Sequence, residues 1–121
     1  MKLRIRGNSL RWRMNRLELN QLAFGESLID SVRFPGGSCF SYALKTHEKP
    51  AVEAHLEGST MEICIPLALV QEWAGNQEVG LSFELPTGEE CLKILIEKDL
   101  ECLHGREEEH DPYAFPSEMR R

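Results

Sequence analysis

The side chains best suited to chemistry in this chain are basic, and they lie close to its start. Residues 1–16 contain six basic side chains and no acidic one, at Lys2, Arg4, Arg6, Arg11, Arg13 and Arg16. The first five recur at every second position within two short segments, which is the spacing that places side chains on one face of a strand. Arginine forms bidentate hydrogen bonds with phosphate and with the edge of guanine. We therefore expect a surface that binds nucleic acid, with an affinity that falls steeply with salt.

Two short strands position these basic side chains. Apolar residues fill the intervening positions, at Leu3, Ile5, Leu10, Trp12 and Met14. Gly7-Asn8-Ser9 between the two segments has the composition of a turn, because Gly and Asn tolerate positive φ. The pattern predicts a hairpin with one apolar and one basic face. Two other interpretations stay open, namely a solvated strand face and a face paired with the protein's own acidic tail.

The chain as a whole predicts an α+β fold that is mainly β, with about eight strands and two short helices. Residues 1–47 show the order strand, turn, strand, helix, strand, turn, strand, and residues 51–97 show the same order. Either the chain is a pseudo-twofold barrel of two ββαββ units, or it is an ordinary α+β domain in which the repeat arises by chance. Asn15 with Glu18 predicts the start of the first helix through a capping box.

Length and composition predict one globular domain over residues 1–104. The chain has 121 residues, of which 41% are hydrophobic and 28% charged, as in ordinary globular proteins. No apolar run approaches the ~20 residues that span a bilayer, and charges interrupt the start of the chain, so we expect a cytoplasmic protein with no membrane contact. The formal net charge of −6 argues against nucleic-acid binding, because such proteins are usually basic overall.

Residues 105–121 differ in composition and predict an acidic, flexible tail. Three consecutive glutamates precede two aromatic residues, Tyr113 and Phe115. Segments of this kind often become ordered on a partner, so the alternative function is a protein-interaction module acting through Tyr113 and Phe115. A tail that only increases solubility, or one that folds back on the basic hairpin, is also open.

The opening segment Leu3 to Met14, with Gly7-Asn8-Ser9 at its turn, resembles the start of the AbrB/MazE-type swapped-hairpin fold. In the second half, Ile63-Cys64-Ile65-Pro66, followed by a helix and by Asn76-Gln77-Glu78-Val79, resembles the same family's strand, Ile-Pro, helix and strand. The resemblance implies interlocked hairpins whose basic strands face DNA, with Arg4, Asn8 and Arg13 as nucleic-acid contacts, to which the alternation adds Arg11.

Two features of the sequence depart from that family. Asn15 stands where the family usually has a proline, and the second hairpin carries glutamates where the first carries arginines. In MazE-like antitoxins an acidic tail blocks a toxin, which makes toxin neutralisation an analogous role for residues 105–121. An AbrB-like unit normally needs two copies, whereas a fused pair is complete as a monomer, so the oligomeric state stays open.

The whole chain also resembles a family of small uncharacterised bacterial proteins. The segments that carry this likeness are Met1 to Met14, Ile96 to Leu103 and Phe115-Pro116. The resemblance implies no activity.

No catalytic or metal-binding motif stands out. The metal-ligand types Cys102, His104, His110 and Asp111 lack the paired spacing of zinc sites, so we expect no metal. No nucleophile motif or phosphate loop is present in the sequence. We therefore expect a binding protein with no enzymatic activity and no cofactor.

Overall fold

In the computed structural model, which describes residues 1–100, the alternating apolar residues build eight strands and two helices. In chain order they are β1 (Lys2–Arg6), β2 (Ser9–Met14), α1 (Arg16–Ala23), β3 (Leu28–Arg33), β4 (Cys39–His47), β5 (Glu53–Glu57), β6 (Thr60–Pro66), α2 (Leu67–Ala74), β7 (Gly80–Pro86) and β8 (Cys91–Lys98). The predicted α+β class, mainly β with two short helices, is confirmed.

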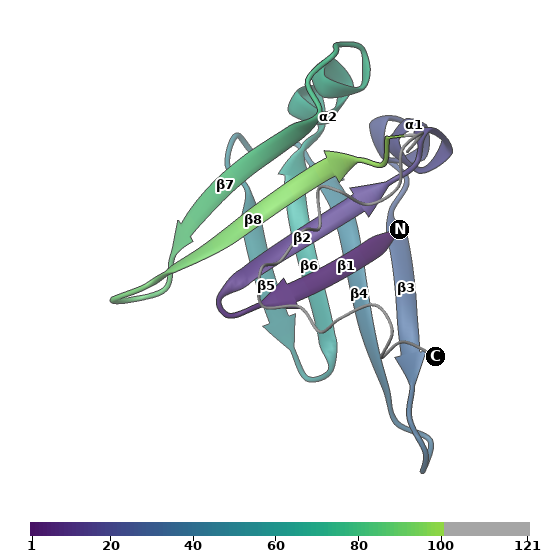
Figure 1. Cartoon of the computed structure of the whole chain (residues 1–121), viewed down its shortest axis with the longest axis vertical. Helices are drawn as coiled ribbons and strands as arrows, with labels where there is room; N and C mark the ends of the chain where they lie inside the picture. The colour runs from purple at the N-terminus through teal and green to yellow at the C-terminus, as the bar shows by residue number, and fades with distance from the viewer. Residues whose placement is uncertain (101–121) are drawn as a thin grey trace, which may run out of the picture.

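The strands form two four-stranded sheets, each built from two hairpins that are distant in the sequence. The first sheet has the order β1-β2-β8-β7 and the second has the order β3-β4-β6-β5. In each sheet the two hairpins meet through a central parallel pair, β2 with β8 and β4 with β6 (Figure 1). Each half of the chain therefore supplies one hairpin to each sheet.

The connectivity of the two halves is equivalent. When every element of the first half is exchanged for its counterpart in the second, the strand order of one sheet becomes that of the other. The pseudo-twofold barrel is not confirmed, because the described strands form two separate sheets with β1, β7, β3 and β5 at their edges. Duplication of an ancestral unit stays a prediction.

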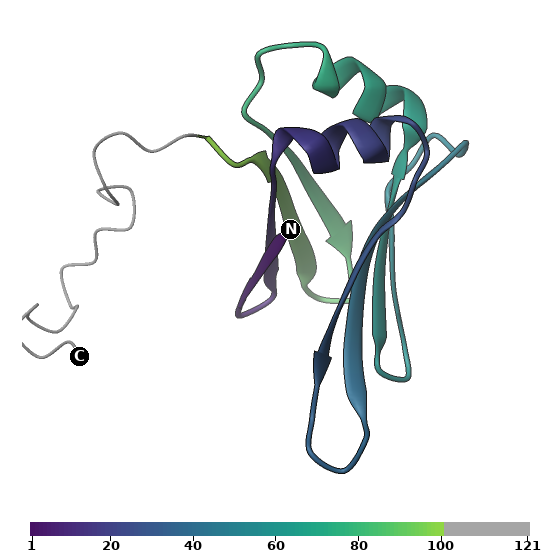
Figure 2. The ribbon, with the colours of Figure 1, turned by 90° about the vertical axis from the view of Figure 1, so that its right-hand side faces the viewer.

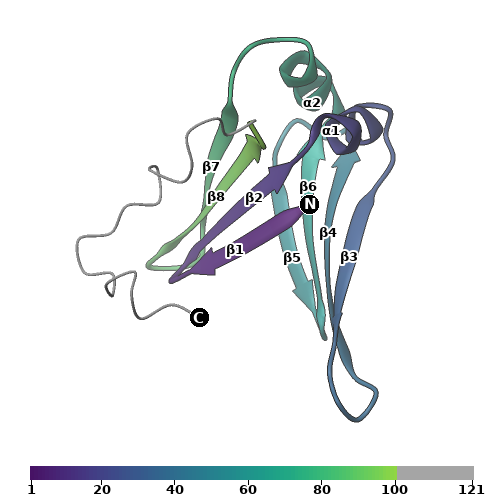
Figure 3. The ribbon, with the colours of Figure 1, turned by 45° about the vertical axis from the view of Figure 1, so that its right-hand side comes forward.

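The core lies between the inner faces of the sheets and below the two helices. Burial alternates along β2, where Leu10, Trp12 and Met14 are buried, as the period-two pattern predicts. Both helices lie across one end of the sheets, and the hairpin turns lie at the other end, where the sheets diverge (Figures 2 and 3). The helices add Leu19, Leu22, Val70 and Trp73 to this core.

Local hydrogen bonds fix the ends of the helices. Asn15 and Glu18 form the predicted capping box, in which each side chain accepts from the other residue's backbone N–H. The amino-terminal ammonium of Met1 also pairs with Glu18. Within the last turn of α2, the buried Trp73 donates its Nε1–H to the carbonyl of Glu78, which follows the helix, at 2.9 Å. Neither helix in residues 1–100 has the length and apolar character needed to cross a membrane.

Candidate nucleic-acid interface

The outer face of the first sheet gathers the basic side chains of β1 and β2. The hairpin register places Lys2 opposite Arg13 and Arg4 opposite Arg11. The intervening residues point to the opposite face, where Leu10, Trp12 and Met14 of β2 are buried in the core and Leu3 of β1 packs against it. Gly7 makes this register possible, because its φ of 56° allows the tight turn into β2. Cations therefore face cations across neighbouring strands.

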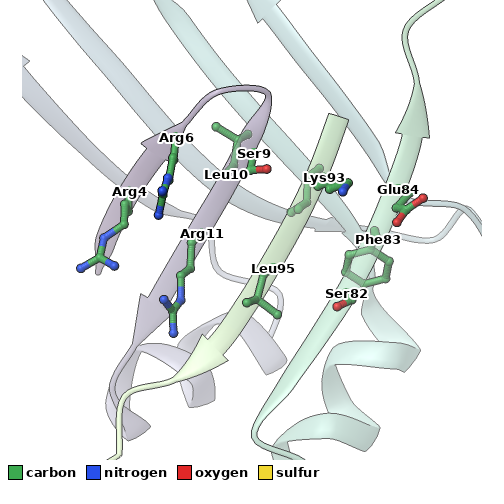
Figure 4. A pocket seen from close by; sticks show the side chains of 11 residues that line it. Arg4, Arg6, Ser9, Leu10, Arg11, Ser82, Phe83, Glu84, Lys93 and Leu95 are labelled. Carbon is green, nitrogen blue, oxygen red and sulfur yellow. The ribbon is translucent and has the colours of Figure 1, made fainter. Parts of the chain in front are cut away.

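A hollow of about 350 Å³ lies over this basic face. Three arginines of the first hairpin, Arg4, Arg6 and Arg11, border it on one side. Lys93 of β8 and Glu84 of β7 border it further along the sheet (Figure 4). The charged side chains around the hollow are therefore mostly cations, and Glu84 supplies the carboxylate among them.

Lys93 is the cation at this face that the sequence analysis missed. Alternation along residues 91–98 places it on the polar side of its strand, but that alone does not say which surface it joins. The parallel pairing of β8 with β2 sets Lys93 beside Ser9, at the same end of the sheet as Arg6. A contact between segments so far apart in sequence has no local signature.

Glu97 of β8 orders two of the predicted arginines. Nε of Arg11 donates to its Oε1 at 2.7 Å, and Nε of Arg13 donates to the same oxygen at 3.2 Å. The Glu97 side chain is only 16% exposed. Burial opposes ionisation of this carboxyl, but the hydrogen bonds and charges of the two arginines outweigh it and hold the pKa of Glu97 below its usual value. Gly80 on β7 leaves room for this side chain, because a Cβ there would lie 3.3 Å from its Cγ.

Asn8, which the resemblance makes a nucleic-acid contact, joins the turn of the first hairpin to β8. Its side-chain amide donates to the carbonyl of Cys91 at 2.8 Å. Its own carbonyl accepts from the N–H of Lys93 at 3.1 Å. These bonds give Asn8 a structural role, and its contact with nucleic acid stays a prediction.

The predicted partner-binding residues Tyr113 and Phe115 lie outside the described part of the chain. The metal-ligand types at positions 102, 104, 110 and 111, for which we expect no metal, also lie outside it. Within residues 1–100, no three His, Cys, Asp or Glu side chains come together as metal ligands. The protein-interaction alternative thus stays a prediction.

Fold and surface together define a small two-sheet α+β protein with a cationic outer face on one sheet. A family model described as "Family of unknown function (DUF7009)" matches residues 1–118, and the chain belongs to this family. Comparisons with curated proteins and with solved structures gave no match. The expectation of an uncharacterised family is thereby confirmed, while the AbrB/MazE resemblance and a bacterial origin stay predictions.

Proposed function

We propose that this protein binds nucleic acid through the outer face of its first sheet, by contacts with backbone phosphates. The observation that carries the proposal is the cross-strand pairing of Lys2 with Arg13 and of Arg4 with Arg11. Like charges directly opposite one another destabilise a sheet. A chain with a net charge of −6 nevertheless concentrates cations on this one face. Glu97 and Asp99 offset part of that repulsion within the protein, and the phosphates of a polyanion would add further favourable contacts.

Double-stranded nucleic acid suits this face better than a single strand. Proteins that bind single strands without sequence preference usually stack bases on aromatic side chains. Phe83 of β7 is among the residues that line the hollow (Figure 4), but the register sets it opposite the buried Ile94, and it packs against the core. Phosphate contacts rather than base stacking are therefore expected.

The resemblance of the first hairpin to the AbrB/MazE type favours DNA and a regulatory role. The counterpart hairpin, β5 with β6, carries Glu53, Glu57 and Glu62 in place of arginines. One protein chain would then present one DNA-binding face, and a palindromic site would not be required.

Fluorescence anisotropy with a labelled mixed-sequence DNA duplex tests the proposal. The Arg4→Glu and Arg6→Glu double variant should bind at least about tenfold more weakly in low salt, because two cations at the hollow become anions. The slope of log affinity against log salt should also fall by about 2, because the variant neutralises two fewer phosphates.

The matched control reverses two basic side chains of the second sheet, as Arg33→Glu with Lys45→Glu. Its charge change equals that of the test variant, so it should reduce affinity far less if the first sheet is the binding face. Equal losses of affinity in the two variants, or no binding by the unaltered protein in low salt, would reject the proposed interface.

A further inference from the structure

The two edge strands β1 and β5 carry opposite charges and form a second pair of matched surfaces. We propose that copies of this protein associate edge to edge, with β1 of one copy pairing antiparallel with β5 of the next. This inference does not require nucleic-acid binding: it uses β1, which the proposed function also uses, together with β5 of the other sheet.

Both strands are suited to extend a sheet. Each contains five residues and lies at the edge of its sheet, with a single neighbouring strand among the described residues. An edge strand presents unpaired backbone N–H and C=O groups that can pair with another chain. Since the two halves have equivalent connectivity, β1 and β5 hold corresponding positions in their sheets.

The backbone of β1 directs the groups of Leu3 and Ile5 towards its open edge. The N–H of Lys93 donates to the backbone carbonyl of Asn8, so the even-numbered residues at this side of β2 point their backbone groups towards β8. The odd-numbered residues of β2 therefore form their backbone hydrogen bonds with β1. In the hairpin register these odd-numbered residues face the charged residues of β1. Alternate residues of a strand point their backbone groups to opposite sides, which leaves Leu3 and Ile5 directed outward.

The same reasoning applies to β5. The N–H of Ser41 in β4 donates to the carbonyl of Ser59 at 2.9 Å, so the odd-numbered residues beside β6 point their backbone groups towards β4. The even-numbered residues of β6, starting at Thr60, therefore form their backbone hydrogen bonds with β5. Their partners in β5 are its charged residues and its histidine. Ala54 and Leu56 therefore direct their backbone groups towards the open edge.

An antiparallel pairing that joins the outward-directed backbone groups of β1 and β5 also places opposite charges across from one another. With Leu3 opposite Leu56 and Ile5 opposite Ala54, the aliphatic residues form the hydrogen-bonded pairs. The non-hydrogen-bonded pairs, whose side chains lie closest, are then Lys2 with Glu57, Arg4 with His55 and Arg6 with Glu53. Opposite charges directly across a strand pair stabilise it.

The apolar side of each edge is incompletely covered. The Ile5 side chain is 56% exposed and that of Leu56 is 67% exposed, although both lie on the inner faces of their sheets. The pairing would set each beside an aliphatic residue of the other copy and remove apolar surface from water.

Charge also disfavours the pairing of two identical edges. Two β1 strands would place cations against cations, and two β5 strands would place carboxylates against carboxylates. Between β1 and β5 only the unlike pair is attractive, so the proposed contact joins different surfaces of the two copies. Such a head-to-tail contact produces a ring when its rotation closes and an open chain when it does not.

Sedimentation velocity over a range of protein concentrations in low salt tests the inference. We expect the mean mass to rise with concentration in low salt and to return to the monomer at about 1 M salt, where the Debye length falls to about 3 Å. Ile5→Pro removes an N–H from the open edge without touching the bonds to β2, and it should abolish association.

Two charge variants give a sharper test. Glu53→Lys with Glu57→Lys makes both edges basic, and Arg4→Glu with Arg6→Glu makes both edges acidic. Each variant alone should remain monomeric, whereas an equimolar mixture should associate, because each basic edge then meets an acidic one.

The control replaces the first variant by Glu89→Lys with Glu90→Lys, in the turn between β7 and β8, which has the same charge change. Because it keeps both unaltered edges, it should associate by itself as the unaltered protein does, whereas the β5 variant by itself should remain monomeric. A monomer of the unaltered protein at every concentration in low salt would overturn the inference, as would equal association of the two basic variants when each is measured alone. Circular dichroism of each variant checks that it is folded.

Discussion

At the scale of single residues, Glu97 determines how the basic face is arranged. It accepts hydrogen bonds from Arg11 and Arg13, and it lies directly opposite Arg13 in the register of β2 with β8. Without it, two guanidinium groups would repel each other and their neighbours on β1. The carboxylate thus fixes the side chains of two of the cations on this face.

Replacement of Glu97 should make the stability of the protein less dependent on pH. The folded state lowers the pKa of this carboxyl, so its ion pairs stabilise the fold above the unfolded pKa of about 4.3 and are lost as the pH falls through the lower, folded value. Glu97→Gln should therefore lower the free energy of unfolding by about 1–2 kcal/mol at pH 7.

Urea denaturation at pH 7 and at about pH 3 measures this effect. The difference between the variant and the unaltered protein should shrink at the lower pH. Glu89→Gln, in the exposed turn before β8, serves as the control and should change the stability little at either pH. A deficit of Glu97→Gln that stays constant over this range would contradict the assigned ion pairs.

Sequence reasoning predicted which side chains share a face but not which residues they contact. Alternation is a local property, so the orientation of Arg11 and Arg13 could be predicted from their immediate neighbours. Their partner Glu97 lies 86 and 84 positions away, and the partner of the Asn8 side chain lies 83 positions away. Those contacts depend on strand pairing between the ends of the chain, which has no local pattern.

At the scale of elements, local sequence patterns predict where a strand or helix begins and ends, but not which other strand it pairs with. Asn15 and Glu18 predicted the start of α1, and the structure confirms their capping box. The parallel pairs β2 with β8 and β4 with β6 were not predicted. A hairpin follows from its turn, whereas a parallel pair needs a long crossover whose destination depends on the packing of the whole core.

Loss of the cap should weaken the fold through α1. Asn15→Ala removes the side-chain acceptor for the N–H of Glu18, and we expect a loss of about 1 kcal/mol in the free energy of unfolding. The same substitution at Asn20, exposed within α1, is the control and should be neutral or slightly stabilising, because alanine has the higher helix propensity. Thermal unfolding followed by circular dichroism distinguishes the two. Equal stabilities would show that the cap contributes nothing.

At the scale of the whole molecule, the two halves of the chain have equivalent connectivity but differ in the charge of their corresponding strands. The outer face of β1 and β2 is basic, while the corresponding strands β5 and β6 carry glutamates. Equivalent strands with the same charge would repel each other across two copies. Under the two proposals, this charge difference would restrict nucleic acid to one sheet and would allow the edges of two copies to attract.

Because β1 takes part in both proposed interactions, the two should exclude one another. Arg4 and Arg6 border the hollow and also face β5 of a second copy in the proposed pairing. A duplex bound to this face would block that edge through its own charge and volume. Adding excess DNA duplex to the associated protein should therefore return it to one copy per binding site, measured by sedimentation velocity.

The variant Glu53→Gln with Glu57→Gln separates the two interactions. It removes the acidic edge without adding positive charge, so it should not self-associate, and its β1 is available to bind DNA at every concentration. Its affinity for the duplex should equal that of the unaltered protein when the protein is dilute, and exceed it at concentrations where the unaltered protein is associated. If the duplex instead binds to the associated protein without dissociating it, β1 does not take part in both interactions. Either the self-association does not use β1, or the DNA-binding face does not include it. The single and mixed charge variants would then identify which of the two is misplaced, since only the edge pairing requires Glu53 and Glu57.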